Sequence, residues 1–146
     1  FNYRMTELQG AIGKVQLNKL NFMISENKKR YKILDSIISK KFCIRSELEN
    51  HSGSYDTFIF SSDDIEVREK IIKILKKLNF GTKNLPDAME WHCSYFWDHA
   101  ITKDNVDASK VTYQILKKQI AIPIMLKRNL EDYQNLARTI FQTLAN

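Results

Sequence analysis

Apolar residues recur at intervals of three and four along the first part of the chain. The series runs from Leu8 to Ile38. This spacing places the apolar side chains on one face of a helix. Thr6 stands just before the series and Gln9 follows three residues later, a combination that is typical of a helix N-terminus. The pattern predicts one long helix, or two joined helices, over residues 6–39.

Two glycines lie inside this predicted helix. Gly10 and Gly13 each cost about 1 kcal/mol of helix stability relative to alanine. Close packing against another backbone is the usual reason for a helix to tolerate glycine. We therefore expect this part of the helix to pack tightly against a neighbouring element.

Shorter apolar runs after residue 39 predict β-strands that alternate with further amphipathic helices. The expected order is a strand over residues 42–45, a strand over 55–60, a helix between Asp64 and its C-cap at Gly81, a helix over 106–118, a strand over 120–125 and a last helix capped by Asn129. This order indicates an α/β fold of the α+β type: a small, mainly antiparallel sheet with helices on one side.

Residues 81–104 show no period and are rich in aromatic residues and histidine, which predicts an extended functional loop. His92, His99 and the neighbouring rings of Trp91, Tyr95 and Trp97 suit a sugar site, because rings stack on apolar C–H faces and imidazoles bond hydroxyls or a carboxylate. Lys83 can pair with a substrate carboxylate. For the aromatic residues, core packing is the favoured alternative, whereas for His92 a structural and a binding role stay open.

The composition suits one compact domain. The chain has 146 residues, of which 43% are hydrophobic, and only two prolines and four glycines. Its net charge of +6 keeps a basic, helical nucleic-acid-binding module as an alternative. The basic residues are scattered along amphipathic segments, however, as on solvated helix faces, so we expect no nucleic-acid partner. No apolar run approaches the roughly 20 residues that span a bilayer, so we expect no membrane segment.

The cysteines and histidines indicate neither a disulfide nor a metal site. Cys43 and Cys93 lie far apart, which favours a reducing cytoplasm. His92, Cys93, Asp98 and His99 do not repeat the ligand spacing of a tetrahedral zinc site. The chain starts with Phe1 rather than methionine, within a structured pattern, and we expect it to be a fragment of a longer protein.

The first thirteen residues carry the most specific motif. The segment FNYRMTELQGAIG resembles the G-[YF]-N-[YF]-R-M-[TS]-E-[LI]-Q-A-A-[IL]-G segment of the DegT/DnrJ/EryC1/StrS sugar aminotransferases. Two later segments are similar to the same family: the histidine-bearing loop after Gly81, and the strand that ends at Pro123. The resemblance covers most of the chain, with Gly10 where the family usually has alanine.

The resemblance implies the C-terminal small domain of a fold-type I enzyme, spanning residues 1–146 and including the interdomain helix at 6–39, with the large cofactor-binding domain outside this chain. It implies that Asn2 contacts the phosphate of the neighbouring subunit's pyridoxal 5'-phosphate (PLP). Arg4 approaches the substrate or orients its loop, or pairs with Glu7. His92 contacts the substrate. The Schiff-base lysine is expected upstream of Phe1, so no catalytic residue is assigned here and the chain alone is expected to be inactive.

The implied reaction moves an amino group from glutamate to a keto-sugar or sugar aldehyde in a cytoplasmic homodimer, for amino-sugar or cell-surface polysaccharide (lipopolysaccharide) biosynthesis. The loop around residues 81–99 looks most like the branch that aminates C8 of a 3-deoxy-octulosonate. A non-catalytic sensor or binding member of the same fold stays open as an alternative. The upstream lysine distinguishes these possibilities, because only a protein that has it forms the internal imine.

Overall fold

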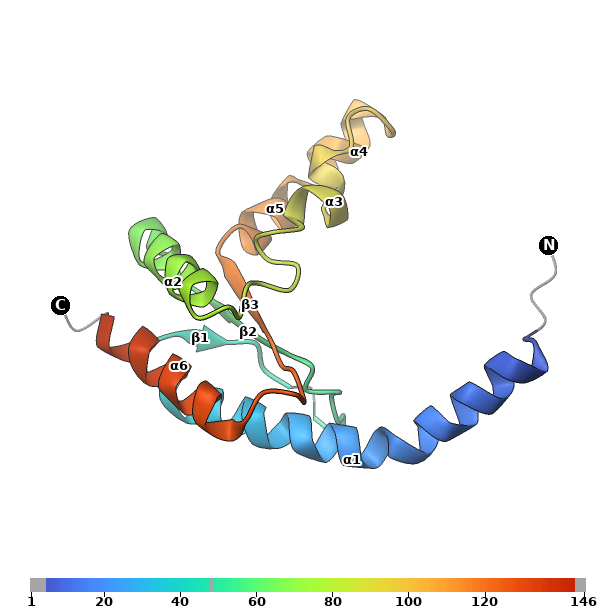
Figure 1. Ribbon diagram of the computed structural model, residues 1–146. Helices are drawn as coiled ribbons and strands as arrows, with labels where there is room; N and C mark the ends of the chain where they lie inside the picture. Colours follow the sequence, from blue (N-terminus) through green and yellow to red (C-terminus); the bar gives the residue numbers. More distant parts are fainter. Residues whose placement is uncertain (1–4, 48, 144–146) are drawn as a thin grey trace.

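The computed structural model describes residues 5–47 and 49–143, which form a small sheet, three helices packed on it and a projecting group of short helices (Figure 1). Asn2 and Arg4, the predicted contacts of cofactor and substrate, lie outside these residues. In chain order the elements are α1 (Glu7–Ile38), β1 (Cys43–Ile44), β2 (Thr57–Ser61), α2 (Ile65–Lys77), α3 (Met89–His92), the 3₁₀ helix η1 (Ser94–Phe96), α4 (Lys103–Ala108), α5 (Lys110–Leu116), β3 (Gln119–Pro123) and α6 (Leu130–Thr143).

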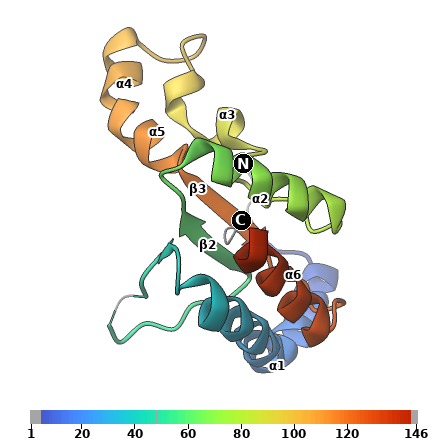
Figure 2. The same cartoon turned by 90° about the vertical axis from the view of Figure 1, so that its left-hand side faces the viewer.

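The sheet has the order β1-β2-β3, and both pairs of neighbouring strands are antiparallel. Phe58 pairs with Ile122 and Phe60 pairs with Ile120, so these four side chains share one face. All four are buried. In Figure 2, α2 and α6 lie on one side of the strands and the loop after β1 extends on the other. The predicted antiparallel sheet with helices on one side is confirmed.

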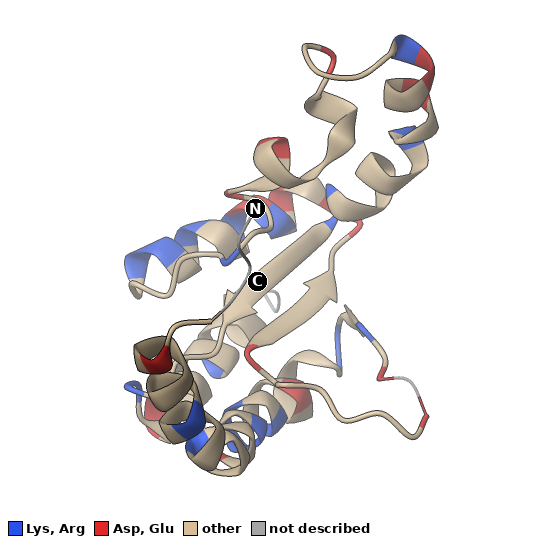
Figure 3. Ribbon diagram, turned by 90° about the vertical axis from the view of Figure 1, so that its right-hand side faces the viewer, with Lys and Arg blue, Asp and Glu red and all other residues tan. Residues whose placement is uncertain are grey.

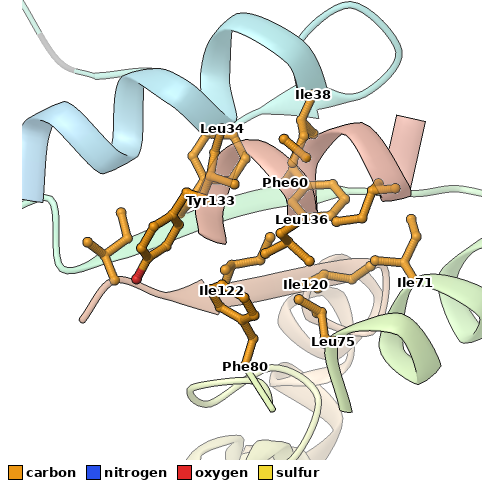
Figure 4. Close-up of a cluster of buried hydrophobic side chains, with 14 residues drawn as sticks. Leu34, Ile38, Phe60, Ile71, Leu75, Phe80, Ile120, Ile122, Tyr133 and Leu136 are labelled. Atoms are coloured by element: carbon orange, nitrogen blue, oxygen red, sulfur yellow. The ribbon is translucent and has the colours of Figure 1, made fainter. Parts of the chain in front are cut away.

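The core lies between this sheet face and the helices (Figure 4). It joins Phe60 and Ile120 of the sheet to Leu34 of α1, Leu75 of α2 and Leu136 of α6, and none of these side chains is more than 1% exposed. Full burial of such a side chain contributes roughly 1.5–3 kcal/mol. The core therefore fixes how the second half of α1 sits against the sheet.

The long first helix begins as predicted. The Thr6 hydroxyl accepts a hydrogen bond from the backbone N–H of Gln9 (3.3 Å), and the Gln9 side chain accepts one from the N–H of Thr6 (2.9 Å). This reciprocal pair satisfies two donors that a helix N-terminus otherwise leaves unpaired. Because α1 then continues to Ile38 without interruption, a single helix is correct and two joined helices are not.

The first half of α1 extends away from the rest of the molecule (Figure 1). Leu8, Ile12 and Val15 are between 52% and 70% exposed. A Cβ placed on Gly13 would meet no other heavy atom within 4 Å, and one on Gly10 would meet only the sulfur of Met5. The expected close packing at these glycines is therefore not formed within the described residues, because no described element reaches this part of the helix.

A buried arginine joins α1 to the segment between β3 and α6. Arg30 is 6% exposed, and its Nη1 donates to the carboxylate of Glu26 one turn earlier (3.0 Å). Its Nε and Nη2 donate to the carbonyl of Arg128 (3.1 and 2.9 Å), and Nη2 also donates to the carbonyl of Leu126 (3.2 Å). The guanidinium thus satisfies two backbone carbonyls that precede α6.

The end of α2 differs from the prediction that Gly81 is its C-cap. The left-handed residue that follows the helix is Asn79, with φ 57°. Its N–H donates to the carbonyl of Lys76 (3.0 Å), and the N–H of Phe80 donates to that of Leu75 (2.8 Å). These two bonds form a Schellman motif. Asparagine adopts this backbone conformation more readily than most residues, so the helix ends before Gly81 is reached.

The last helix begins as predicted. The side-chain oxygen of Asn129 accepts a hydrogen bond from the N–H of Asp132 (2.8 Å), which caps α6. Tyr133 is fully buried, and its hydroxyl accepts a hydrogen bond from the N–H of Met125 (2.8 Å). This bond connects the first turn of α6 to the residues that follow β3.

The helices α3, η1, α4 and α5, here called the helical lobe (residues 86–118), extend from the start of β3 away from α1 and α6 (Figure 1). The lobe corrects two predictions. Residues 81–104 contain short helices rather than an extended loop, and the helix expected over 106–118 is divided between α4 and α5 at Ser109. Tyr95 and Tyr113 hold the lobe together by stacking in parallel, with ring centroids 4.4 Å apart.

Basic residues are spread over α1, α2 and the lobe, with acidic residues among them on α1 and in the lobe (Figure 3). The strands carry no Lys, Arg, Asp or Glu. Among residues 5–47 and 49–143, no helix is both long enough and apolar enough to cross a membrane.

Candidate functional site

The N-terminal motif ends at the capped start of α1. Asn2 and Arg4, the predicted cofactor and substrate contacts, lie outside the described residues, so their roles stay predictions. The next residues are described: Thr6 caps α1, and Glu7 lies in its first turn. A helix N-terminus favours anions, because its first N–H groups are unpaired and the helix dipole is positive there.

Lys83 lies beside the outer strand of the sheet. Its N–H donates to the carbonyl of Ala121 in β3 (3.0 Å), and the N–H of Ala121 donates to the carbonyl of Leu85 (3.0 Å). The segment thereby covers part of the open edge of β3. The Lys83 ammonium forms an ion pair with Asp56 just before β2, and this hydrogen bond lowers the pKa of the Asp56 carboxyl against the opposing effect of partial burial. Lys83 thus already has a carboxylate partner within the chain.

His92 and His99 lie on the helical lobe. His92 ends α3 and its side chain is exposed, and His99 is 75% exposed beside Asp98. Neither histidine lines the pocket to which Lys83 contributes. The structure therefore does not bring Lys83 and His92, the two predicted substrate residues that it describes, to one cavity.

The aromatic residues of the lobe divide into packed and exposed rings. Tyr95 packs on Tyr113 and, edge to face, on Phe96 with centroids 5.4 Å apart, as the core-packing alternative predicts. Core packing is wrong for Trp91, which is 80% exposed next to His92. An exposed indole and an exposed imidazole at adjacent positions offer an apolar face and a hydrogen-bonding group to a ligand.

The main cavity lies on the sheet face that the helices leave open. Its volume is ≈ 530 Å³, and a second hollow of ≈ 450 Å³ adjoins it. The sheet contributes Thr57, Ile59 and Ala121. Tyr31 of α1, the loop after β1 and the segment 83–85 that precedes the lobe contribute the rest, among them Arg45, Ser46, Glu47, His51, Ser52, Ser54, Tyr55, Asp56, Lys83 and Asn84.

We call this cavity the sheet-face pocket. Among its polar residues, only Lys83 is predicted from the sequence to bind a ligand. Arg45 was assigned only to a predicted strand and His51 only to a loop, and no spacing in the sequence indicates that this loop folds back over β2.

Two tyrosines that border the pocket lie in unusual environments. Tyr31 on α1 packs edge to face on Tyr55, with ring centroids 5.3 Å apart. Burial, reinforced by the nearby charge of Asp35, raises the pKa of the Tyr31 hydroxyl. Tyr55 is 7% exposed and has φ 52°, a left-handed conformation that is rare for an aromatic residue.

The described residues do not by themselves form a PLP site. Every lysine among them is exposed, whereas a Schiff-base lysine is activated in a desolvated pocket. They also contain no group of three His, Cys, Asp or Glu side chains placed to hold a metal ion. The prediction that the cofactor lysine lies upstream of this chain stays a prediction.

The comparison with known families decides the relationship. The sequence profile of the DegT/DnrJ/EryC1/StrS aminotransferase family matches residues 1–141. The chain belongs to this family. Its members are PLP-dependent sugar aminotransferases. The match spans the N-terminal motif, the sheet and the helical lobe. No curated protein sequence matches the chain significantly.

Solved structures share the fold of this family member. Helicobacter pylori PseC, an aminotransferase involved in the biosynthesis of pseudoaminic acid, matches with TM-score 0.67 and 19% identity over 99% of this chain. The putative sugar aminotransferase Spr1654 of Streptococcus pneumoniae, in its PMP form, matches with TM-score 0.65 and 17% identity over 94%. The sugar aminotransferase CalS13 of Micromonospora echinospora matches with TM-score 0.68 and 14% identity over 97%.

These matches place the fold in the C-terminal part of fold-type I aminotransferases. The chain covers 39% of PseC and 36% of Spr1654 and CalS13. Spr1654 has also been solved in a PLP form. The comparison does not distinguish branches of the family.

Proposed function

We propose that this chain is the C-terminal small domain of a longer PLP-dependent sugar aminotransferase, with α1 as the interdomain helix. The observation that carries the proposal is the family match over residues 1–141, which includes the motif FNYRMTELQGAIG. The fold supports it, because sugar aminotransferases resemble this chain over nearly its whole length while it covers little more than a third of theirs.

The proposed reaction transfers an amino group from glutamate to a keto-sugar or sugar aldehyde, in the cytoplasm, for amino-sugar or cell-surface polysaccharide biosynthesis. PLP supplies the electron sink for this chemistry when it is bound. In the proposed homodimer, Asn2 donates to the phosphate of the cofactor in the partner subunit. The chain's own contribution is to position the substrate, since none of its described lysines is buried.

His92 is the proposed substrate contact on the lobe, and Arg4 and Lys83 are proposed to bind acidic or hydroxyl groups. The exposure of His92 at the end of α3 supports the first role, because the imidazole is free to meet a ligand that approaches the lobe. For Lys83, binding a substrate carboxylate requires that its ammonium be shared with, or released by, Asp56. The 3-deoxy-octulosonate branch is the proposed substrate branch.

The test uses the full-length protein with PLP, glutamate and candidate keto-sugars. We expect the absorbance of a protein-bound imine and the formation of an amino-sugar. The His92→Ala variant is expected to lower kcat/KM for the sugar by about tenfold, as for one lost hydrogen bond. The half-reaction with glutamate should be unchanged, because His92 is proposed to contact only the sugar.

Glu90→Ala is the control, since Glu90 is also an exposed residue of α3 but has no proposed substrate role, and it should leave both half-reactions unchanged. A full-length protein that forms no imine and transfers no amino group from glutamate would refute the proposal. Equal losses in both half-reactions for His92→Ala would refute the substrate role of His92 alone.

A further inference from the structure

The sheet-face pocket has the dimensions and lining of a site for a small polar ligand. A volume of ≈ 530 Å³ falls within the range of small-molecule sites. Its floor is the helix-free face of the sheet, at Ile59 and Ala121, and its walls carry hydroxyl and amide groups, among them Ser52, Ser54 and Asn84. This lining combines a small apolar floor with several hydrogen-bonding groups.

Some charged side chains of the pocket have partners within the chain, and one has none among the described residues. The carboxylate of Asp56 pairs with Lys83 and accepts a hydrogen bond from the Ser54 hydroxyl (2.9 Å). The carboxylate of Glu47 accepts a hydrogen bond from the Tyr55 hydroxyl (3.3 Å). Both acidic groups of the pocket therefore have partners within the chain.

Arg45 is the exception. Its N–H donates to the carbonyl of Ile59 (3.1 Å), which fixes its backbone beside β2. Its side chain is exposed and borders both the pocket and the adjoining hollow. Within the described residues its guanidinium takes part in none of the hydrogen bonds or ion pairs. A guanidinium in a pocket whose two carboxylates, Glu47 and Asp56, already have partners is well placed to bind an incoming anion in a bidentate manner.

The loop that carries these groups is held in a strained shape. Tyr55 is buried with φ 52°, a left-handed conformation that is strained for a residue other than glycine. Three residues of α1 hold the loop at this point. The Tyr31 ring packs edge to face on Tyr55, the ammonium of Lys28 lies 5.1 Å from the Tyr55 ring centroid, and Asn27 donates a hydrogen bond to the carbonyl of Ser54 (3.1 Å). Strain that the surroundings maintain is frequent at ligand sites.

We propose that the sheet-face pocket binds a small hydroxylated molecule that bears a carboxylate or phosphate, with Arg45 as the ligand of the anionic group. Ser52, Ser54 and Asn84 are placed to bond its hydroxyls. The site requires neither PLP nor the residues of the helical lobe. Lys83 lines this pocket too, but Arg45 has no role in the proposed aminotransferase function, so the two proposals fail separately.

The experiment is a titration of this chain with glucuronate, glucose monophosphate and glucose, followed by the amide NMR signals of residues 49–56 and 83–85. We expect saturable shifts with at least one of the two anions and none with neutral glucose. If only one anion binds, the group that it carries identifies the anion that the pocket accepts. Absence of binding by both anions, or equal binding of glucose, would overturn the proposal.

Two arginine variants give the matched comparison. Arg45→Ala should bind the anion about tenfold more weakly or worse, because it loses a charge-assisted bidentate contact. Arg138→Ala removes the same charge from the exposed face of α6, away from the pocket, and should bind normally. Unfolding curves of both variants check that the fold is retained. An Arg45→Ala variant that is folded and binds normally would also overturn the proposal.

Discussion

At the scale of single residues, the buried side chain of Arg30 makes the clearest energetic prediction. Replacing Arg30 with methionine keeps an apolar stem but leaves the carbonyls of Leu126 and Arg128 without their donor. We expect the free energy of unfolding to fall by about 1–3 kcal/mol, since partly buried carbonyls that lose their partners carry a desolvation cost. Urea unfolding followed by circular dichroism measures the change.

The neighbouring residue provides the control. Lys29 also pairs with Glu26, but its side chain is 60% exposed. Lys29→Ala should change the free energy of unfolding by roughly 0.5 kcal/mol or less, as is usual for surface ion pairs. Similar losses in the two variants would show that the carbonyl contacts of Arg30 contribute little.

The pattern of hydrophobic and polar residues does not predict contacts of this kind between single side chains. Arg30 bonds to carbonyls almost a hundred residues later, and Lys83 pairs with Asp56 across 27 positions. Periodicity reports which residues share a face of one element, but it carries no information about partners on different elements. The capping pairs were predictable because each joins residues only three apart: Thr6 with Gln9 and Asn129 with Asp132.

At the scale of elements, the helical lobe is expected to unfold separately from the sheet. The cluster of buried side chains that forms the core contains no residue of the lobe. Tyr113→Ala removes the parallel stack with Tyr95 and the edge contact with Phe96. We expect amide hydrogen exchange in residues 89–116 to accelerate by about ten- to a hundredfold, with no change in strands β2 and β3.

Val111 supplies the comparison within the same helix, because it is 70% exposed and its truncation should leave exchange unchanged. Uniform acceleration throughout the protein in Tyr113→Ala would show instead that the lobe and the sheet unfold together.

Element prediction succeeded where one face of a segment is buried over several turns. The positions of α1 and α6 followed from their apolar stripes, and Leu34, Leu136 and Ile140 are indeed in the core. The lobe gave no such signal. Its helices have only three to seven residues and pack through aromatic pairs between elements, which produces no helical period.

At the scale of the whole molecule, the order of elements sufficed to predict an antiparallel sheet with helices on one side, and the N-terminal motif sufficed to indicate the family. The sheet-face pocket was not predictable, because it forms where segments far apart in the sequence meet, among them the loop after β1, the strands β2 and β3 and the residues after Gly81. Such a meeting depends on the register of β2 with β3, which the sequence pattern leaves open.

The exposed first half of α1 makes the final prediction. Leu8, Ile12 and Val15 form an apolar stripe that no described element covers, and Gly13 adds backbone that a neighbour can approach closely. Contiguous apolar surface of this kind favours association. We expect this chain alone to form concentration-dependent oligomers in analytical ultracentrifugation.

The double variant Ile12→Glu with Val15→Glu should sediment as a monomer, since two charges then lie in the stripe while glutamate preserves the helix. Lys14→Glu lowers the net charge by the same two units at an exposed position of α1 outside this stripe, and should associate like the unchanged chain. If Lys14→Glu also becomes monomeric, the charge of the helix controls association. A monomer for the unchanged chain at every concentration would mean that the stripe is tolerated in water.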